Sequence, residues 1–135
     1  MKDYIKIGID KKLIDIIDDG KKILYTHQNK KYNYKDPEEQ VRASYYIELV
    51  ERYEYPPQRI NFEIPIPRRI QGDYADIVVF KDDEQKEPYI VVECKKDAIS
   101  DAEFLQAIEQ AFGNANNLNA HFISVVSGIT IKSFN

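Results

Sequence analysis

Two apolar runs that lie close together in the chain constrain its fold more than any other feature. Residues 74–80 read YADIVVF and residues 88–94 read PYIVVEC, and the segment between them, KDDEQKE, is short and charged. Continuous apolar runs are typical of central strands, which are covered on both faces. A short polar connection between two such runs favours a hairpin. The chain is therefore expected to build a sheet with these two strands near its centre.

Two segments with helix signals could cover that sheet. Residues 36–39, DPEE, form a strong helix start, because Asp is a good N-cap, Pro fits the first turn and acids suit a helix N-terminus. We expect this helix to run to about Tyr53, before the two prolines at 56–57. A second helix is predicted from residue 100 or 101 to Leu118, where apolar residues recur at helical spacing.

Three further runs are candidate strands. Residues 59–67 alternate apolar and polar positions, and their two prolines fit an edge strand. HFISVVS at 121–127 reads as another strand, and ITIKSF at 129–134 is a further candidate. Near the N-terminus, the runs 12–18 and 21–27 flank an Asp-Gly pair that is favoured in tight hairpins, and residues 28–36 read as a polar connector. The element order indicates an α/β fold with a mixed sheet, packed helices and an N-terminal β-hairpin over residues 1–35.

Composition excludes several classes of protein. The chain has 135 residues, 43% hydrophobic and 31% charged, which is typical of one folded domain. No apolar run is long enough to cross a membrane, and MKDYIKIGID at the start lacks the apolar stretch of a secretory signal, so we expect a cytoplasmic protein. A single cysteine excludes an intrachain disulfide and a cysteine-rich zinc site. No glycine-rich phosphate loop is present, so no ATP site is expected.

Three charged residues stand where a core is predicted. Asp76 lies inside an apolar run, Glu93 ends the next run, and Lys95 follows on the same face as Glu93, whereas Lys96 should point to the opposite face. Neighbouring strands lie about 5 Å apart, so the two acids and Lys95 converge. Two carboxylates this close repel each other unless a cation lies between them, and oxygen ligands suit Mg²⁺. A strand-end salt bridge is the alternative for either acid alone, but the combination favours a site.

The same residues carry a resemblance to a known family. GDYADIVVF followed by IVVECKK resembles the PD-(D/E)XK nuclease superfamily. Three flanking segments, DPEEQVR, YEYPPQRINFEIPI and EQAFGNANNLNAHFISVVSG, are similar in order to the N-terminal nuclease domain of type I restriction enzyme R (motor) subunits. The resemblance covers about residues 36–128 and implies a nuclease core with a restriction-endonuclease-like sheet, within a single domain over 1–135. Because motor subunits of this kind carry their ATPase in later domains, the chain is expected to be a fragment or a stand-alone relative.

The resemblance implies a role for each residue of the strand motif. Asp76 and Glu93 would be metal ligands, with the backbone carbonyl of Cys94 as a further ligand, and Lys95 would be the catalytic lysine. The metal would be Mg²⁺, for which Mn²⁺ could substitute. The cysteine side chain itself is expected to serve in packing.

The two helices are also expected to contribute to the site. The family's acid on the first helix corresponds to Glu39 or Glu38, of which Glu39 is preferred from its spacing, and capping of the first turn is the alternative for each. The family's catalytic glutamine corresponds to Gln110, with Asn114 where the family has a tyrosine. By helical spacing, Gln110 lies beside the apolar face and Gln106 nearer solvent. Arg42 is expected to pair with a site acid or a DNA phosphate, or to snorkel.

The predicted function is that of a Mg²⁺-dependent DNA endonuclease domain in a type I restriction-modification system. Its partners would be DNA and the specificity and methyltransferase subunits. The net charge of −4 disfavours strong DNA binding by the domain alone, so sequence recognition is assigned to other subunits. The alternatives are a catalytically inactive module that only binds nucleic acid or protein, and a repair-type nuclease of the same superfamily. The complete set of two acids and a lysine favours catalysis.

Overall fold

The fold is built around a five-stranded sheet with helices on both faces. The computed structural model describes residues 2–67, 73–128 and 130–134. In the order in which they pair, the strands are β4 (Ile60–Pro65), β5 (Tyr74–Phe80), β6 (Pro88–Lys95), β7 (Phe122–Ser127) and β8 (Thr130–Phe134). All neighbours are antiparallel except β6 and β7, which are parallel. The predicted mixed sheet is confirmed; residue 129 of the predicted run 129–134 lies outside the described residues.

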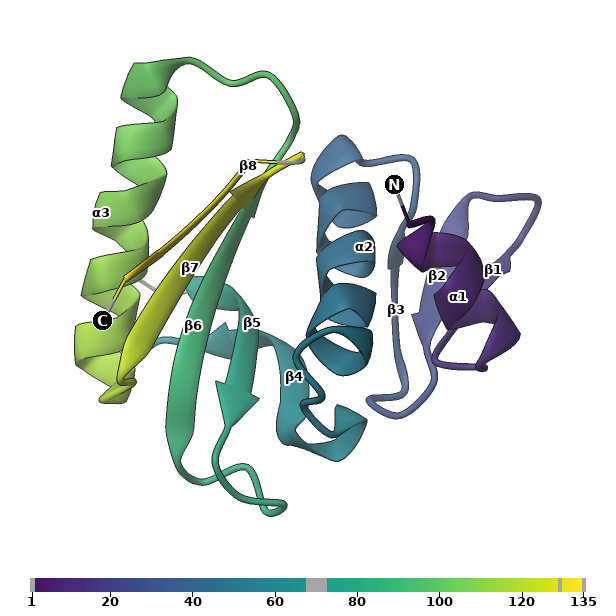
Figure 1. The fold of residues 1–135 in the computed structure, drawn as a ribbon, viewed down its shortest axis with the longest axis horizontal. Coiled ribbons are helices and arrows are strands. Elements are labelled where there is room, and N and C mark those ends of the chain that lie inside the picture. Colours follow the sequence, from purple (N-terminus) through teal and green to yellow (C-terminus); the bar gives the residue numbers. More distant parts are fainter. Residues whose placement is uncertain (1, 68–72, 129, 135) are drawn as a thin grey trace.

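The helix α3 (Asp101–Leu118) allows β6 and β7 to run in the same direction. A parallel pair needs a long crossover, and α3 supplies it along one face of the sheet (Figure 1). Ser100 and Glu103 form a reciprocal capping box at its start, and Asn119 ends it in a left-handed conformation. These ends agree with the predicted helix.

The helix α2 (Pro37–Glu51) covers the other face of the sheet. The carboxylate of Asp36 accepts the N–H of Glu38 at 3.0 Å, as expected for an N-cap. The helix ends two residues before the predicted Tyr53, and a 3₁₀ turn, η1 (Pro57–Arg59), leads into β4. Figure 1 shows α3, the sheet and α2 as successive layers. Among the described residues, no helix combines the length and apolar character needed to cross a membrane.

Alternating residues of the two central strands fill two separate cores. Ile77, Val79 and Val92 pack with α2, whereas Val78 and Val91 pack with α3, and all five are inaccessible to solvent. This two-sided burial is what the continuous apolar runs predicted. A charged side chain on either strand must therefore be paired or serve another purpose, because an uncompensated buried charge is costly.

The N-terminal hairpin is present but belongs to a larger sheet. β1 (Ile14–Ile17) and β2 (Lys22–Tyr25) pair as predicted. The prediction of a polar connector over residues 28–36 was wrong, because a third antiparallel strand, β3 (Lys30–Asn33), forms there. Alternation explains the strand: the Tyr32 ring packs 5.9 Å from the Tyr25 ring, centre to centre, while its neighbours in sequence are exposed.

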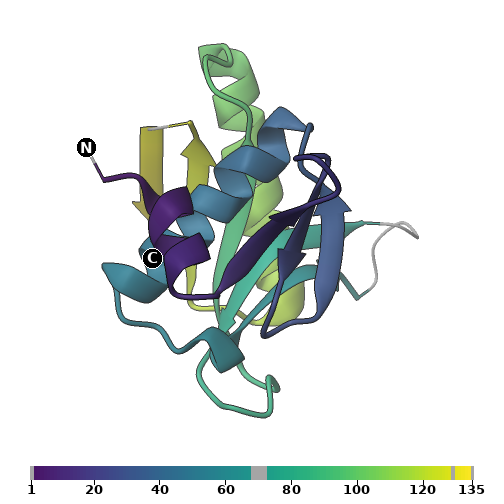
Figure 2. The ribbon, with the colours of Figure 1, turned by 90° about the vertical axis from the view of Figure 1, so that its right-hand side faces the viewer.

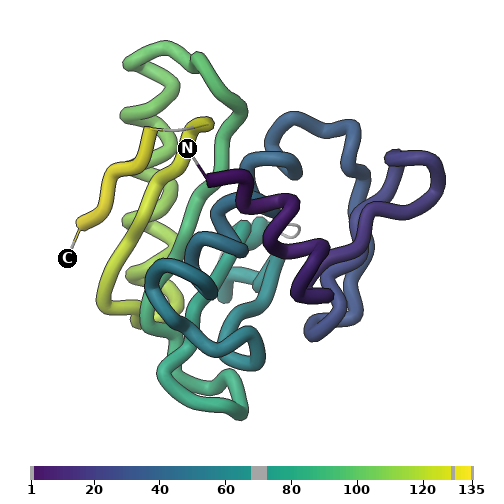
Figure 3. The backbone as a smooth tube through the Cα atoms, turned by 45° about the vertical axis from the view of Figure 1, so that its right-hand side comes forward, coloured from purple at the N-terminus to yellow at the C-terminus, as the bar shows by residue number. Residues whose placement is uncertain are grey.

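A short helix, α1 (Tyr4–Asp10), precedes this sheet and was not predicted. Asp3 caps it by accepting the N–H of Lys6 at 3.1 Å. Gly8 lets α1 lie close to α2, because a Cβ at this position would stand 2.6 Å from Cδ1 of Ile47. Figures 2 and 3 show α1 beside α2. The N-terminal elements thus pack onto α2 (Figure 1), and they also reach the edge of the five-stranded sheet, where the ring of Tyr25 lies 4.1 Å from that of Phe62 on β4, centre to centre.

Candidate active site

The two acids predicted to bind metal lie opposite each other on neighbouring strands. In the antiparallel pairing of β5 with β6, Ile77 is the partner of Val92, so one further step places Asp76 across from Glu93. The backbone N–H of Cys94 donates to Oδ2 of Asp76 at 2.8 Å. The carboxylate of Asp76 is thereby held toward β6, beside Glu93.

Glu93 is a buried acid whose surroundings favour its protonated form. The residue is 1% exposed, and Nδ2 of Asn114 on α3 donates to its Oε1 at 2.9 Å. Burial, together with the charge of Asp76 and a hydrogen bond between the two carboxyl groups, raises the pKa of Glu93 well above its ordinary value. Among the described residues, no basic side chain forms an ion pair with Glu93. Glu93 therefore faces another acid, Asp76, and its raised pKa favours the protonated form.

Asp76 borders a cavity of about 250 Å³. Burial raises the pKa of Asp76, although the Cys94 N–H and the charge of Arg42 oppose the shift. The cavity lies between α2 and strands β4, β5 and β6, and the residues that line it are Asp36, Glu38, Glu39, Arg42, Glu63, Tyr74, Asp76 and Cys94. Carboxylates dominate this list, so the cavity is lined mainly by acidic side chains.

Lys95 lies half-buried at the end of β6 and lines a second cavity of about 180 Å³. Gln110 of α3 lines the same cavity and is exposed. Gln106, which helical spacing placed nearer solvent, lines it too. Lys96 was expected on the opposite face, but β6 ends at Lys95, the alternation of a strand stops there, and Lys96 also lines this cavity.

The two candidate acids of α2 differ in their surroundings. Glu38 is half-buried and lines both cavities. Burial raises its pKa, the charge of Lys95 opposes this shift, and the charge of Asp76 adds to it. Glu38 therefore stands between the cavity of Asp76 and the cavity of Lys95.

Glu39, by contrast, is 6% exposed and its carboxylate is already paired. Nη2 of Arg42 donates to Oε1 at 2.5 Å and Nε of Arg42 donates to Oε2 at 3.1 Å. The hydroxyl of Tyr25 also donates to Oε2, at 2.5 Å. Of the partners expected for Arg42, the structure supplies an acid, Glu39.

A comparison with known protein families gives an assignment for most of the chain. Residues 37–135 match the family described as type I restriction enzyme R protein N terminus (HSDR_N). The chain belongs to this family. Membership indicates a role in a type I restriction system. No curated protein and no solved structure matches the chain significantly.

The part of the chain that matches the restriction enzyme R protein family includes the acid pair and Lys95. The match begins at the first residue of α2 and runs to the last residue of the chain. Residues 1–36, which form α1 and the three-stranded sheet, precede it. The N-terminal elements nevertheless contact the site, because Tyr25 of β2 binds Glu39.

Asn114 is a site residue that the sequence prediction did not include. It stands where the family has a tyrosine, yet it is 1% exposed and donates to Glu93. A signal was present, because Asn114 stands on the buried face of α3 near Ala111 and Ala115, where an amide needs a partner. Tyr25 gave no such signal, because its partner is distant in the chain.

The donor set fits a hard divalent cation. Asp76 and Glu93 offer carboxylate oxygens, and the carbonyl of Cys94 faces the same neighbouring strand as its N–H, which binds Asp76. Within the described ranges, no group of three or more His, Cys, Asp or Glu side chains could hold a metal. Water and phosphate oxygens would complete the coordination, as Mg²⁺ favours. Burial raises the pKa of the Cys94 thiol, and its side chain packs in the core beside α2.

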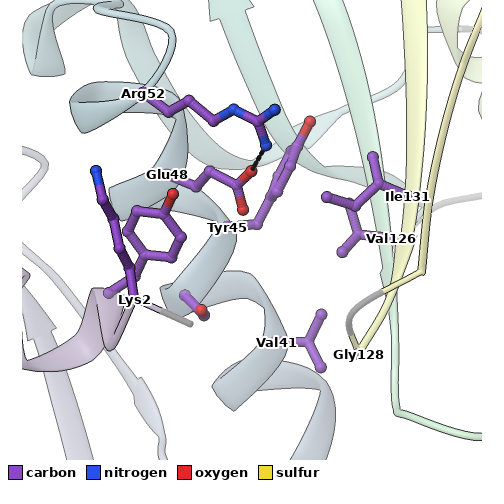
Figure 4. Close-up of a pocket in the computed structure, with 10 residues that line it drawn as sticks. Lys2, Val41, Tyr45, Glu48, Arg52, Val126, Gly128 and Ile131 are labelled. Carbon is purple, nitrogen blue, oxygen red and sulfur yellow. Dashed lines mark hydrogen bonds and ion pairs between the residues drawn. The ribbon is translucent and has the colours of Figure 1, made fainter.

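Another cavity, of about 310 Å³, lies between α2 and strands β7 and β8 (Figure 4). It is lined by none of the residues predicted for the site. Its buried acid, Glu48, accepts a hydrogen bond from Nη1 of Arg52 at 3.0 Å, and Val126 and Ile131 form an apolar wall. The acid in this cavity already has a cation, so the acid pair on β5 and β6 remains the candidate site.

Proposed function

We propose that the chain is a Mg²⁺-dependent DNA endonuclease domain of a type I restriction-modification system, which hydrolyses phosphodiester bonds. The observation that carries the proposal is the pairing of half-buried Asp76 with buried Glu93, two acids that lie across from each other on neighbouring strands and whose pKa values are both raised. Two acids held this way destabilise the fold when both ionise, and a divalent cation removes the repulsion. Mn²⁺ is expected to substitute for Mg²⁺.

The strand residues divide the proposed chemistry between them. Asp76, Glu93 and the backbone carbonyl of Cys94 hold the ion, which neutralises charge on the scissile phosphate. Lys95, two residues after Glu93 and half-buried beside a cavity, orients the attacking water and stabilises the charge that develops on the phosphate. Asn114 fixes the Glu93 carboxylate through the hydrogen bond from its amide.

The helices complete the proposed site. Glu38 is better placed than Glu39 to act as the helix acid, because it borders both cavities while the Glu39 carboxylate is occupied by Arg42 and Tyr25. Gln110 lies at the cavity of Lys95, where its amide can bind the attacking water or a DNA phosphate. The proposed roles of Glu38 and Gln110 are to orient polar ligands through hydrogen bonds.

The proposed substrate and partners follow from the family. DNA is the substrate, and the specificity and methyltransferase subunits of a restriction complex are the partners. A repair-type nuclease would use the same residues, but the family match favours restriction. A module that only binds nucleic acid or protein is less favoured, because it would have no use for two facing acids beside a lysine.

The test of the proposed function combines DNA cleavage with Mn²⁺ binding. Lys95→Ala should abolish Mg²⁺-dependent cleavage in the assembled enzyme, or in this domain at high concentration, because the charge that stabilises the phosphate is lost. It should leave the fold and most Mn²⁺ binding, measured by calorimetry, intact, because Lys95 is not a ligand. Asp76→Ala should abolish Mn²⁺ binding. If Asp76→Ala bound Mn²⁺ with the affinity of the wild type, the proposed ion site would be wrong.

Lys96→Ala is the matched control. Lys96 lines the same cavity as Lys95 but follows the end of β6 and is exposed. Its replacement should reduce cleavage far less than that of Lys95. If Lys96 proved essential and Lys95 dispensable, the active site would be assigned to the wrong lysine.

A further inference from the structure

A continuous set of contacts connects the N-terminal sheet with Asp76. It starts at Tyr25 of β2, which is fully buried and donates from its hydroxyl to Glu39 at 2.5 Å. Glu39 accepts from Arg42 through both carboxylate oxygens. Arg42 in turn donates from Nη1 to the backbone carbonyl of Asp76 at 3.3 Å. Tyr25, Glu39, Arg42 and Asp76 form one network, here called the Tyr25–Asp76 network.

Arg42 has a fixed orientation within this network. Its guanidinium carbon lies 4.3 Å from the centre of the Tyr32 ring on β3, and the residue is 5% exposed. Burial disfavours its charge, but the hydrogen bonds and charge of Glu39 outweigh burial and raise the pKa of Arg42. Arg42 is therefore a charged, planar donor in one orientation. Two of the residues that hold it, Tyr25 and Tyr32, precede the part of the chain that matches the family.

Arg42 contacts Asp76 at the point where the pairing of β4 with β5 is interrupted. The register passes from Phe62–Ile77 to Ile64–Ala75, and Glu63 between these pairs has a φ of +52°. A non-glycine residue rarely adopts this conformation, and strained backbone of this kind is concentrated at functional sites. The Asp76 carbonyl, across from this interruption, accepts a hydrogen bond from Arg42 of α2.

We propose that Arg42 is a positioning residue that sets the backbone of Asp76, and that the N-terminal sheet is part of the catalytic unit because Tyr25 and Tyr32 hold Arg42. The Glu39 carboxylate serves this network rather than a bound ion. The inference rests on the proposed function for its consequence in catalysis, whereas the geometry at Asp76 can be measured without any activity.

The principal test is Arg42→Lys, which keeps a positive charge beside Glu39 but removes the planar fork that binds Glu39 and Asp76 together. Mn²⁺ affinity is measured by calorimetry, and kcat and KM for DNA cleavage are measured in the assembled enzyme. We expect a roughly 10- to 100-fold loss in Mn²⁺ affinity or kcat with little change in KM, as for other residues that orient a ligand. The backbone N–H of Cys94 donates to Asp76, so the NMR chemical shift of this amide proton should differ between metal-free Arg42→Lys and the metal-free wild type.

Two further variants separate positioning from general stability. Tyr25→Phe removes only the hydroxyl that binds Glu39, keeps the ring in the core, and carries the test if Arg42→Lys does not fold. Tyr46→Phe removes another buried tyrosine hydroxyl, one that contacts Gln28 at 3.3 Å and belongs to no part of the network. Tyr25→Phe should change Mn²⁺ affinity, kcat and the Cys94 shift in the same direction as Arg42→Lys. Tyr46→Phe should leave all three unchanged.

The outcomes are distinguishable. Equal effects of Tyr25→Phe and Tyr46→Phe would overturn the inference, as would wild-type values of Mn²⁺ affinity, kcat and Cys94 shift in a folded Arg42→Lys variant. If the wild type neither binds Mn²⁺ nor cleaves DNA but the Cys94 shift still moves in Arg42→Lys, the proposed function fails and the positioning role of Arg42 stands.

Discussion

Glu39 and Glu93 are both buried acids beside the candidate site, yet their surroundings are opposite. Glu39 accepts three hydrogen bonds, two from the cationic Arg42 and one from Tyr25. Glu93 has an amide, Asn114, and a second acid, Asp76, as its neighbours. The α2 side of the site therefore pairs its acid with a cation, whereas the β5–β6 side brings two acids together.

This difference shows that burial alone does not distinguish a structural acid from one that binds a ligand. The residue that the buried acid contacts does. An acid that is paired with arginine inside the protein is complete and can hold other residues in place. Two acids that face each other need a proton or a cation, and that requirement is expensive for a purely structural feature. The β5–β6 side is the one that a ligand would complete. Three predictions follow from the comparison, each measured as a change in the free energy of unfolding.

The largest change is expected for Glu39→Gln. The amide has one acceptor oxygen in place of two, so its NH₂ group would face a donor of Arg42 or the Tyr25 hydroxyl, and the Arg42 charge would lose its counterion. We expect the free energy of unfolding to fall by about 3–5 kcal/mol, the range for breaking a buried ion pair. Urea denaturation with the linear extrapolation would measure it.

Glu38→Gln is the control for this prediction. Glu38 is the adjacent residue of α2 but is only half-buried, and no ion pair to it is present among the described residues. Its replacement should change the free energy of unfolding by less than about 1 kcal/mol. Similar losses in Glu38→Gln and Glu39→Gln would show that the Arg42 network does not stabilise the α2 side.

A smaller, pH-dependent change is expected from the acid pair. The pKa values of Asp76 and Glu93 are raised above 3.8 and 4.5, so the folded protein binds these protons more tightly than the unfolded chain does. The resulting stabilisation is complete below the unfolded values and is lost as the pH rises through the raised values, by about 1.4 kcal/mol for each unit of pKa shift. Urea denaturation of the metal-free protein at a series of pH values would measure this loss.

Glu93→Gln isolates the contribution of the pair. The glutamine cannot ionise, yet it can accept from Asn114 and donate to Asp76. The pKa values of Asp82 and Glu103 are lowered, so these two acids make the free energy of unfolding rise with pH. Both acids are present in the wild type and in Glu93→Gln, so their effect cancels when the two free energies are subtracted. The quantity to follow is the free energy of unfolding of the wild type minus that of Glu93→Gln. If this difference did not change between about pH 4 and about pH 8, the folded protein would bind no extra proton at the acid pair.

The central elements of the fold were predictable because each carries its signal locally. The apolar runs of β5 and β6 and the caps of α2 and α3 appear within a few consecutive residues, and the structure places these elements within two residues of the expected ends. β3 was missed because its alternation spans only four residues, too few to distinguish a strand from a polar connector. α1 was missed as well, because it is only seven residues long and its close approach to α2 depends on Gly8, a residue that does not favour helices.

The site was predictable to a lesser extent, for a physical reason. The proximity of Asp76, Glu93 and Lys95 follows from the pairing of adjacent strands, which the hairpin between them already implies. The choice between Glu38 and Glu39 does not, because adjacent helix residues differ by about 100° in direction and only the packing of α2 decides which one is buried. One partner of Glu39, Tyr25, lies 14 residues earlier in the chain on a separate sheet, and no local pattern indicates this contact.

The smallest change is expected for Asp76→Asn, the same kind of substitution that should be so damaging at Glu39. The asparagine oxygen can still accept the Cys94 N–H, and its amide can donate to the Glu93 carboxylate. Repulsion between two carboxylates is removed, so the metal-free variant should be at least as stable as the wild type, while Mn²⁺ binding and cleavage are lost. Urea denaturation in the presence of a chelator would measure the free energy of unfolding of the wild type, Asp76→Asn and Glu39→Gln under the same conditions. A loss of several kcal/mol, as in a broken ion pair, would mean that the charge of Asp76 stabilises the fold as that of Glu39 does, and that both sides of the site are alike.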